Sequence, residues 1–437
     1  MNPASPSRVA LVNPPWSFEG SIYFGCRSPH LPLEYGYARQ LLAAAGHDAR
    51  IFDAQMDGTS LERLRSEVEA YAPTMVVVTT APSYLFWRCA PPELRVPLEA
   101  LAALAPIEAT KIVVGPHAST TPLATLRKTG ADAVIVGECE ELLVRVAAAG
   151  GEGWRDLPSI AFVDRGIARV TGGPHACNMS ELPALHWDGA TVRRHQHHHH
   201  RFDVEPEGPG AEIETSRGCP YHCTFCAKEN FRNAYRKRPL GTVLDELDGL
   251  LAQGVRYVYF VDEIFLPDRP LLEALAERDV RFGVQMRIDN WSEDTLDLLG
   301  RAGCVSIEAG VESITPEGRR LLAKRCKAST EELTHLLVHA KMRVPFVQAN
   351  LLEGKTDDPG DVARWREGLK RQGVWSNEPV PLFPYPGTPD YTERWGAPDD
   401  RAWERAHADY LARFGSFSDI QESRPLPLED LERVAHA

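Results

Sequence analysis

The sequence predicts an α/β protein in which a doubly wound parallel sheet is followed by a partial (βα)6 barrel. Three observations lead to this fold class. Five short apolar runs alternate with helical stretches between residues 8 and 150, and six more alternate with helices from residue 211 onward. The length of 437 residues suits two or three domains. Strands that alternate with helices pair in parallel, and such sheets bind ligands beyond the carboxyl ends of their strands.

The first sheet is expected within residues 1–150. Its strands are predicted at 9–13, 49–53, 75–79, 111–114 and 133–136. A helix over 33–46 ends at Gly46, because glycine favours the left-handed conformation found at helix ends. Small, polar or aromatic residues follow the strands and are the candidate ligand contacts of this domain: Asn13, Ser83, Tyr84, Gly115, His117, Gly137 and Glu138.

Residues 151–206 are expected to connect the two sheets. A small hairpin is predicted from 159–163 and 168–171 around Gly166. Beyond it, five histidines stand among arginines: His195, His197, His198, His199 and His200. We interpret this run as a solvated connector. A divalent metal bound by neutral imidazoles, or a substrate-binding loop over the barrel mouth, is the alternative.

The barrel is expected over residues 207–415, with a short charged tail at 416–437. Its strands are predicted at 212–215, 255–261, 281–286, 304–309, 345–351 and 379–383. Thr242 is the candidate cap of a helix that ends at Gly254, and Ser292 is the candidate cap of a later helix. Six βα units are too few for a complete eight-stranded barrel, so the barrel is expected to be partial.

Composition narrows the functional classes. The 48 basic and 61 acidic residues give a formal net charge of −13, which provides no general attraction to nucleic acid or to an anionic membrane. No apolar stretch reaches the length of a membrane span, and the amino-terminal residues lack the pattern of a signal peptide. We therefore expect a soluble, cytoplasmic protein whose nine cysteines form no disulfide framework.

Three of the cysteines lie close together in the sequence. Cys219, Cys223 and Cys226 follow the first predicted barrel strand with the spacing C-x3-C-x2-C. Thiolates are soft ligands that suit iron–sulfur clusters and zinc. Three thiolates leave one iron of a cubane open, and an open iron can chelate the amino and carboxylate groups of S-adenosylmethionine. A zinc site with His222 as fourth ligand and a chance grouping in a loop are the alternatives.

This segment, with Phe225 before the third cysteine, resembles the signature of the radical S-adenosylmethionine (radical SAM) superfamily. The resemblance implies a [4Fe–4S] cluster on the three cysteines, which are then the metal-binding and catalytic residues. It also implies that residues at or near barrel strand ends contact S-adenosylmethionine: Phe225, Asp262, Glu263, Arg287, Ser306, Glu308, Glu312 and Tyr385. Asp262 and Glu263 would lie at the methionine amino group, and Glu312 near the ribose and carboxylate. For each acidic residue, a solvated strand end or a helix cap is the alternative.

Residues 8–150 resemble the cobalamin-binding domain of class B radical SAM proteins, which is flavodoxin-like. The matching segments are 13–15, 33–37, 115–118 and 136–140. Two features depart from this pattern. The Asp-x-His-x-x-Gly sequence that supplies an imidazole to cobalt in other corrinoid proteins is absent, and Cys139 stands where many relatives have Gly. A relic domain that binds no corrin is therefore the alternative. Ser83 and Tyr84 would pack on the corrin face or in an interdomain core, and His117 would contact the corrinoid tail.

Together the two resemblances imply an enzyme that uses a [4Fe–4S] cluster, S-adenosylmethionine and cobalamin. It would cleave S-adenosylmethionine reductively, abstract hydrogen from a small-molecule substrate with a 5′-deoxyadenosyl radical, and methylate an unactivated carbon. An external electron donor such as flavodoxin or ferredoxin is implied. The alternatives are a radical rearrangement, cyclisation or oxidation and, from another class, a non-catalytic iron–sulfur or corrinoid sensor. A zinc-knuckle nucleic-acid binder agrees poorly with a net charge of −13.

Overall fold

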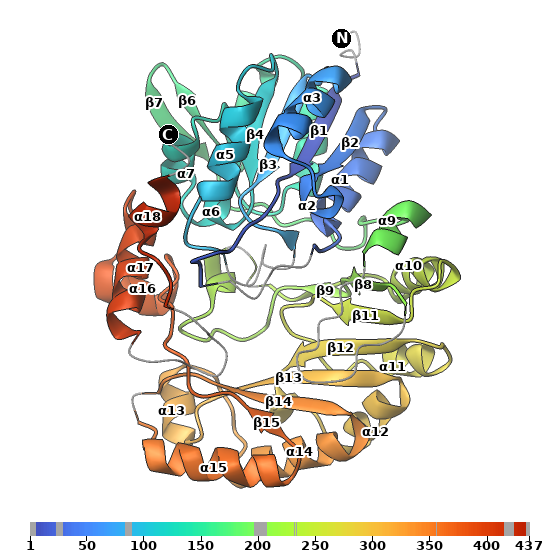
Figure 1. Ribbon diagram of the computed structural model, residues 1–437, viewed down its shortest axis with the longest axis vertical. Helices are drawn as coiled ribbons and strands as arrows, with labels where there is room; N and C mark the ends of the chain where they lie inside the picture. Colours follow the sequence, from blue (N-terminus) through green and yellow to red (C-terminus); the bar gives the residue numbers. More distant parts are fainter. Residues whose placement is uncertain are drawn as a thin grey trace.

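The chain folds around two sheets that follow each other in the sequence. The computed structural model describes residues 6–22, 29–83, 90–195, 208–230, 232, 234–354, 356–414 and 424–433. Figure 1 shows the first sheet and its helices above the second sheet, with the carboxy-terminal helices along one side. None of the described helices is long and apolar enough to cross a membrane.

The first sheet and its helices extend to Thr171. Their bounds are β1 Arg8–Asn13, α1 Leu33–Ala44, β2 Asp48–Asp53, α2 Ala54–Asp57, α3 Leu61–Tyr71, β3 Met75–Thr79, α5 Arg95–Leu104, β4 Thr110–Val114, α6 Pro116–Thr120, α7 Pro122–Thr129, β5 Ala133–Ile135, α8 Glu140–Ala149, β6 Ile160–Asp164 and β7 Ile167–Thr171. The helix α9, Gly189–Arg194, follows in the segment that leads to the second sheet.

The seven strands of the first sheet have the order β2-β1-β3-β4-β5-β6-β7. The first five are parallel, which confirms the five predicted strands. The β6–β7 hairpin, which we expected in the connector, pairs antiparallel with β5 and continues this sheet. It thereby covers an edge that β5 would otherwise leave unpaired. Side chains of β1 alternate between two apolar layers, with Val9 and Leu11 in one layer and Ala10 and Val12 in the other.

The second sheet and the elements around it begin at Gly210. Their bounds are β8 Gly210–Ile213, β9 Ser216–Arg217, β10 Arg236–Lys237, α10 Leu240–Ala252, β11 Tyr257–Phe260, α11 Arg269–Ala276, β12 Arg281–Met286, α12 Glu293–Arg301, β13 Cys304–Glu312, α13 Pro316–Leu321, α14 Thr330–Arg343, β14 Phe346–Leu351, α15 Pro359–Arg371, β15 Trp375–Ser376, α16 Pro389–Trp395, α17 Ala402–Arg413 and α18 Leu428–Glu432.

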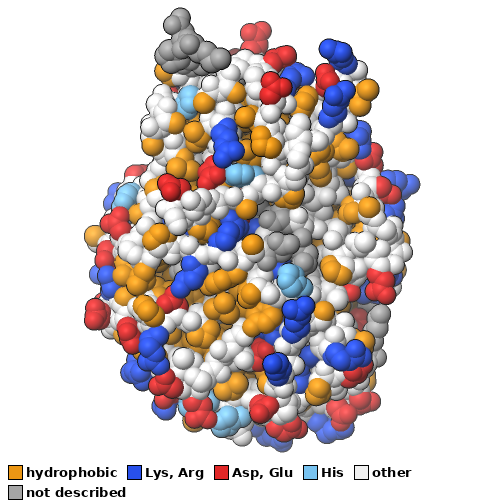
Figure 2. Space-filling view, turned by 180° about the vertical axis from the view of Figure 1, so that it is seen from behind, with side chains coloured by type: hydrophobic (Ala, Val, Ile, Leu, Met, Phe, Trp, Pro, Cys, Tyr) orange, Lys and Arg blue, Asp and Glu red, His pale blue; other side chains and the backbone are white. Residues whose placement is uncertain are grey.

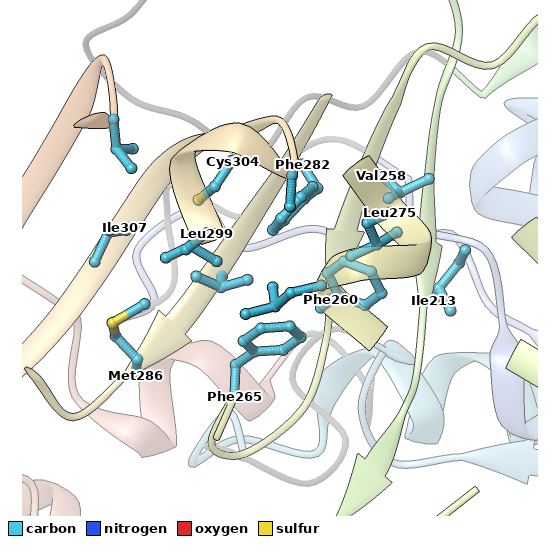
Figure 3. Close-up of a cluster of buried hydrophobic side chains, with 14 of the residues drawn as sticks. Ile213, Val258, Phe260, Phe265, Leu275, Phe282, Met286, Leu299, Cys304 and Ile307 are labelled. Atoms are coloured by element: carbon cyan, nitrogen blue, oxygen red, sulfur yellow. The ribbon is translucent and has the colours of Figure 1, made fainter. Parts of the chain in front are cut away.

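Six parallel strands in the order β15-β14-β13-β12-β11-β8 form the second sheet, which confirms the partial barrel. Its core lies between the sheet and the surrounding helices (Figure 3). The ring centroids of Phe260 and Phe265 lie 5.1 Å apart, and Phe282 meets Phe260 edge to face at 5.4 Å. These aromatic side chains bury large apolar areas and fix the spacing of β11 and β12.

Two predicted helix starts have different outcomes. Ser292 caps α12 through a reciprocal capping box with Thr295, as predicted. Thr242 is not a cap, because α10 begins earlier, at Leu240. The N–H of Val243 donates to the carbonyl oxygen of Pro239 at 3.2 Å, which places Thr242 inside the first turn.

The sixth barrel strand was predicted at the wrong position. The strand β15 lies at Trp375–Ser376 rather than at 379–383, where only Val380 forms an isolated bridge, with Leu352. Prolines interrupt the predicted stretch, and proline has no N–H to donate to a strand ladder. The side chain of Asn377 replaces the missing backbone bonds: its Oδ1 accepts from the N–H of Leu351 at 2.7 Å, and its Nδ2 donates to the Leu351 carbonyl at 2.9 Å.

The carboxy-terminal helices contact both halves of the molecule. Trp403 of α17 lies in an aromatic cluster with Tyr385, and its Nε1 donates to the Thr121 hydroxyl at 2.9 Å. Glu432 of α18 accepts from the N–H of Leu94 at 2.9 Å. The helix α18 falls within the stretch that we described only as a short charged tail. Figure 2 shows acidic and basic side chains interspersed over one face of the molecule, with apolar side chains gathered near its middle.

Candidate metal and cofactor site

The cysteine triplet lies on a loop that two short strands close. β9 and β10 pair antiparallel, with Arg217 opposite Arg236. Gly218 begins the loop with a φ of +81°, and a Cβ at this position would lie 2.1 Å from the carbonyl oxygen of Ala234. Glycine alone accepts both this φ without strain and this close approach of two backbone segments. The turn just before Cys219 therefore depends on Gly218.

Hydrogen bonds fix the path of the loop between its cysteines. The Lys228 Nζ donates to the carbonyl oxygen of Cys219 at 2.9 Å. The N–H of Thr224 donates to the carbonyl of Leu322 at 3.1 Å, and the Thr224 carbonyl accepts from the N–H of Asp390 at 3.1 Å. The loop is thus held by the turn that follows it, by the segment after α13 and by α16.

The three thiols form a donor set of sulfur alone, and each cysteine is half-buried. Among the described residues, the ligand atoms of Glu141, His175 and Cys177 form the one set of three that lies within 4.8 Å of one another. The triplet thiols are therefore spread more widely than a single zinc ion requires, since Zn–S bonds measure about 2.3 Å. In an iron–sulfur cluster each thiolate binds a different iron, so a wider spread is expected. The residues fit such a cluster better than mononuclear zinc.

Cationic groups surround the triplet. The Arg287 guanidinium lies 3.7 Å from the ring centroid of Tyr221, inside the triplet, and pairs with Asp289 at 2.7 Å. Burial alone would lower the pKa of Arg287, but Asp289 and the Cys223 thiol raise it. Burial raises the pKa of Cys223 to about 11, against the opposing charge of Lys324. These cations offset the negative charge that thiolates bring to a metal site.

Asp262 and Glu263, which follow β11, hold the backbone that leads into the loop. Asp262 accepts from the N–H of Thr215 at 2.8 Å and from the Ser216 hydroxyl at 2.6 Å. Burial raises the pKa of Asp262 to about 6. Glu263 accepts from the N–H of Gly218 at 2.8 Å and from Arg232 at 2.6 Å. The resemblance had assigned both carboxylates to the methionine amino group, and that role stays a prediction.

The predicted residues of β13 lie along one strand. Ser306 is buried, and Glu308 accepts from Gln285 at 2.8 Å. Glu312 ends the strand with a φ of +64° and pairs with Lys324. Lys324 also donates to the carbonyl oxygen of Gly310 at 2.9 Å. The end of β13 is therefore joined to the segment that holds Thr224.

Phe225 and Tyr385 are the two aromatic residues predicted to contact S-adenosylmethionine. Phe225 is half-buried within the triplet. Tyr385 packs on Phe383 with ring centroids 4.7 Å apart. Next to Tyr385, the carbonyl oxygen of Pro386 accepts from the Asn230 side chain at 2.9 Å. Tyr385 therefore belongs to an aromatic cluster. The residue that follows it, Pro386, contacts the chain just after the triplet.

At the carboxyl edge of the first sheet, the predicted polar contacts are engaged by the protein itself. Asn13 donates to Asp53 at 2.8 Å and accepts from Trp16 at 2.7 Å. Ser83 accepts from the N–H of Leu33 at 2.9 Å and bonds to the buried Glu34. Tyr84 lies outside the described residues.

His117 and the glycines at this edge are also buried in protein contacts. His117 stacks on Trp403 with ring centroids 3.9 Å apart, and burial lowers its pKa to about 3. Gly115 precedes it with a φ of +112°. A Cβ on Gly137 would lie 2.3 Å from the carbonyl oxygen of His175. Contact of these residues with a corrin stays a prediction.

Glu138, whose contact with a cofactor stays a prediction, meets three arginines in and beside the cysteine loop. Its carboxylate lies 3.0 Å from Arg232, 2.5 Å from Arg236 and 3.4 Å from Arg217. Although burial alone would raise the pKa of Glu138, the charges of Arg217 and Arg232 hold it well below its usual range. A carboxylate so surrounded has its hydrogen-bonding positions occupied by the protein. The loop after β5 is thereby joined to the cysteine loop.

Arg217 is the centre of this buried network, which sequence reasoning missed. It is fully buried and pairs with Glu140 at 2.6 Å and with Glu214 at 2.9 Å. Tyr37 of α1 lies 5.5 Å from Arg217 and 5.1 Å from Arg238, measured from each guanidinium carbon to the ring centroid. The one sequence signal was the presence of charged residues in otherwise apolar surroundings at 138–140 and 214–217. Arg217, which directly precedes the Gly218 turn, therefore joins the two sheets.

His195 corrects our interpretation of the histidine run as a solvated connector. It is fully buried, with its Nδ1 2.6 Å from the carbonyl oxygen of Gly210 and its Nε2 3.1 Å from Glu212. Burial alone would lower the pKa of His195, but the charge of Glu212 raises it. The remaining histidines, 197–200, lie outside the described residues.

Comparison with known proteins finds one family model that matches part of the second half of the chain. Residues 213–365 match the model of the Radical SAM superfamily. The chain is 24% identical over 333 residues to an uncharacterized methyltransferase of Pyrococcus horikoshii, which covers 72% of the chain and 68% of that protein. It is 23% identical over 406 residues to the anaerobic magnesium-protoporphyrin IX monomethyl ester cyclase of Cereibacter sphaeroides, covering 86% of the chain and 63% of the cyclase. The chain thus spans about two thirds of the length of these relatives.

Two solved structures share most of this fold. TsrM of Kitasatospora setae, a radical S-adenosylmethionine methyltransferase with cobalamin and a [4Fe–4S] cluster bound, superposes with a TM-score of 0.68 at 21% identity, covering 89% of this chain and 74% of TsrM. OxsB, a cobalamin-dependent S-adenosylmethionine radical enzyme, gives a TM-score of 0.68 at 16% identity, covering 93% of this chain and 66% of OxsB. Likeness at these identities is likeness of fold, and it confirms the predicted fold class.

Proposed function

We propose, because residues 213–365 match the Radical SAM superfamily, that this protein cleaves S-adenosylmethionine reductively and methylates an unactivated carbon of a small-molecule substrate. Cys219, Cys223 and Cys226 would hold a [4Fe–4S] cluster, and the carboxyl edge of the first sheet would face cobalamin. When bound, the cluster supplies the electron that splits S-adenosylmethionine into methionine and a 5′-deoxyadenosyl radical, and cobalamin supplies a transferable methyl group.

One observation carries the proposal: the sulfur-only loop is joined to the carboxyl edge of the first sheet. Arg217 lies two residues before Cys219 and pairs with Glu140 of the first sheet at 2.6 Å. Ligands of doubly wound sheets bind at this edge, and those of barrels bind at the carboxyl ends of the strands. The ion pair brings the cysteine loop next to the loop after β5, and two cofactors that act on one substrate must lie close together.

The chain's own residues would position the cluster and S-adenosylmethionine and would offset the negative charge of the thiolates. Glu263 and Lys228 fix the backbone on either side of Cys219 at 2.8 and 2.9 Å. Arg287 places a buried positive charge over Tyr221, between the first and second cysteines. Ser306, Glu308 and Glu312 on β13 remain our proposed contacts to S-adenosylmethionine. The names of TsrM and of the Pyrococcus relative support methyl transfer as the reaction.

Anaerobic reconstitution tests the proposal. The full chain is incubated with iron, sulfide and hydroxocobalamin, desalted, and measured by metal analysis and visible absorption. We expect about four irons and about one cobalt per chain, and formation of 5′-deoxyadenosine with S-adenosylmethionine and dithionite. Iron without cobalt would contradict the cobalamin-dependent methyl transfer but not the radical chemistry. Absence of 5′-deoxyadenosine would contradict the radical chemistry and favour a sensor.

A second candidate reaction is a radical cyclisation without methyl transfer. It is favoured by the match to the Cereibacter cyclase, which covers more of this chain than the match to the Pyrococcus methyltransferase. The two reactions are separated by S-adenosylmethionine with a labelled methyl group. Transfer of the label to a product supports methylation, whereas label that remains in S-adenosylmethionine and methionine supports the cyclisation.

A further inference from the structure

A glutamate, a histidine and a cysteine outside the triplet meet at the start of α8. Glu141 lies in the first turn of α8, and His175 and Cys177 lie in the segment that follows β7. One ligand atom from each of these residues lies within 4.8 Å of the other two. We name these three residues the Glu-His-Cys set. Carboxylate oxygen, imidazole nitrogen and thiolate sulfur are the three kinds of ligand that bind Zn²⁺ in proteins.

Backbone hydrogen bonds fix the segment after β7 on the loop after β5. The N–H of His175 donates to the carbonyl oxygen of Val136 at 2.9 Å, and the His175 carbonyl accepts from the N–H of Glu138 at 2.9 Å. The N–H of Cys177 donates to the Glu138 carboxylate at 2.7 Å, and the Cys177 carbonyl accepts from Arg236 at 2.7 Å. Both residues are thus held in place without the use of the imidazole or the thiol.

Glu141 divides its two oxygens between the backbone and the imidazole. Its Oε1 accepts from the N–H of Asn178 at 2.8 Å, and its Oε2 lies 2.9 Å from the Nε2 of His175. The Sγ of Cys177 also faces a carboxylate and donates to the Oε2 of Glu140 at 3.3 Å. Carboxylates that bind metals are commonly oriented by a hydrogen bond from outside the ligand set. The bond from Asn178 can do this for Glu141 while Oε2 binds an ion.

The spacing of the Glu-His-Cys set suits one small cation. Bonds of about 2.0–2.3 Å to a central Zn²⁺ place tetrahedral ligand atoms roughly 3–4 Å from one another. Small side-chain rotations within the present 4.8 Å therefore suffice. The ion would come between the Nε2 of His175 and the Oε2 of Glu141 and replace their hydrogen bond. The thiol proton of Cys177 would leave to solvent, and the thiolate and the carboxylate would balance the two positive charges of the ion.

Three arginines near the set are compatible with a bound cation. Arg217 pairs with Glu140 at 2.6 Å, and Arg236 pairs with Glu138 at 2.5 Å. The charges of these two arginines are therefore offset by carboxylates outside the set. Arg145 lies 3.9 Å from the carboxylate of the set, but its side chain is 49% exposed, so solvent screens its charge.

We propose that Glu141, His175 and Cys177 bind one Zn²⁺ ion, with water at the fourth position. Zinc sites that keep an open position have this arrangement of three protein ligands and one water. Cys177 is buried, whereas the side chains of His175 and Glu141 are 15% and 20% exposed, which gives an ion and a water access from solvent. The ion would cross-link α8 to the segment that leads to the second sheet. This site uses no residue of the triplet and does not depend on the radical chemistry.

Zinc retention by the full chain tests the site. The anaerobically reconstituted protein is incubated with Zn²⁺, desalted in the presence of a competing chelator, and analysed for zinc and for iron. Its iron content establishes that the triplet is loaded and therefore cannot take up zinc. The variants are Cys177→Ala and His175→Gln, whose amide can still bond to Glu141. The control His339→Gln removes a histidine outside the set that bonds to Asp297 at 2.8 Å.

We expect the wild type and the control to retain about one zinc per chain. Changes to groups that only orient ligands cost about 10- to 100-fold in metal affinity, so the loss of a ligand should raise the Kd for zinc about 100-fold or more in both variants. A wild-type chain that retains no zinc would overturn the inference. Equal retention by the wild type and both variants would overturn it as well, because the zinc would then lie elsewhere, for example on the histidines at 195–200.

Cobalt(II) provides a second measurement, which reports the ligand atoms directly. It is added to the full chain in which Cys219, Cys223 and Cys226 are replaced by Ala. Bound Co²⁺ should show an intense near-ultraviolet band from sulfur-to-metal charge transfer, because Cys177 supplies a thiolate. The histidines at 195–200 contribute no sulfur and cannot produce this band. One equivalent of Zn²⁺ should remove the band, and so should the further change Cys177→Ala. Bound Co²⁺ without the band, or a band that persists in Cys177→Ala, would overturn the inference.

Discussion

At the scale of the residue, Glu34 shows how burial sets the charge of one side chain. It lies at the start of α1, is 5% exposed and bonds to Ser83. Burial raises its pKa from 4.5 to about 7, against the lowering effect of the Ser83 hydrogen bond. Between these two pH values the unfolded chain has lost a proton that the folded chain retains. Stability from this group is therefore present below pH 4.5 and is lost as pH rises toward 7.

Glu34→Gln should remove this pH dependence. The amide keeps an acceptor for Ser83 but cannot ionise, so the variant should gain stability relative to wild type as pH rises from about 5 to about 8, by roughly 3 kcal/mol at most. Denaturant unfolding of the metal-free chain at both pH values measures the change. Glu62→Gln, on the exposed face of α3, is the control. The same pH dependence in Glu34→Gln and wild type would show that Glu34 is ionised in the folded chain.

The triplet offers a second prediction at this scale. Replacing Cys219, Cys223 and Cys226 with Ala should abolish iron loading and S-adenosylmethionine cleavage while the first sheet stays folded, because the thiolates are the ligands. Iron content, visible absorption and thermal unfolding measure the three properties. Cys326→Ala removes another half-buried thiol and should load iron normally. A triple variant that keeps its cluster would show that the ligands lie elsewhere.

Single residues also show what sequence can and cannot predict. The triplet was predictable because its ligands are close in sequence and their spacing is encoded locally. The role of Glu138 was not, because its partners Arg217, Arg232 and Arg236 lie on another domain, and no local pattern encodes tertiary ion pairs. The same reason applies to His195, whose partner Glu212 lies beyond the histidine run.

At the scale of the element, Gly218 decides the geometry of the loop that carries the thiols. Gly218→Ala would place a Cβ 2.1 Å from the Ala234 carbonyl oxygen. The β9–β10 ladder would have to open, so we expect a loss of roughly 2–4 kcal/mol in stability and a marked fall in iron loading. Thermal unfolding and iron analysis measure both.

Gly254 provides the matched control for this element. It follows α10 with a φ of +92°, and nothing lies within 4 Å of a Cβ built on it. Gly254→Ala should therefore lower the free energy of unfolding by only about 1 kcal/mol, the cost of a left-handed backbone conformation in alanine. Iron loading should stay intact. If both variants lose iron equally, the close approach at Gly218 is not what shapes the loop.

The elements themselves were largely predictable from apolar periodicity. β3 and β12 have the predicted bounds. Each is a strand in the interior of a parallel sheet, and most of its residues are buried. The errors occurred where side chains replace backbone bonds. Asn377 completes the ladder beside β14, so β15 lies ahead of the prolines. Helix starts behaved differently: the predicted cap at Ser292 is present, whereas α10 begins ahead of Thr242 and without a side-chain cap.

At the scale of the whole molecule, the buried charge network holds the two sheets together. Removing one partner of a buried ion pair leaves the other uncompensated, so Glu138→Gln should lower the free energy of unfolding by roughly 3–5 kcal/mol. It should also weaken iron loading, because Arg232 and Arg236 flank the loop. Denaturant unfolding and iron analysis measure these effects.

An exposed ion pair provides the comparison. Asp57 of α2 pairs with Arg194 of α9, and the two side chains are 39% and 51% exposed. Solvent screens such a pair, so Asp57→Asn should cost less than about 1 kcal/mol. Equal losses in Glu138→Gln and Asp57→Asn would mean that the buried network adds nothing beyond an ordinary surface contact.

The network also has a consequence for synthesis on the ribosome. The first sheet is complete once β7 ends at Thr171, yet Glu138 and Glu140 find their arginines only at residues 217–236. While the chain emerges, these carboxylates must stay hydrated, and the loop after β5 cannot close over them. Amino-terminal units generally form first during translation. Here the first sheet and its helices would reach their final packing only after the cysteine loop has emerged. The thiols would therefore become available to a cluster-delivery system at the moment when the two halves join.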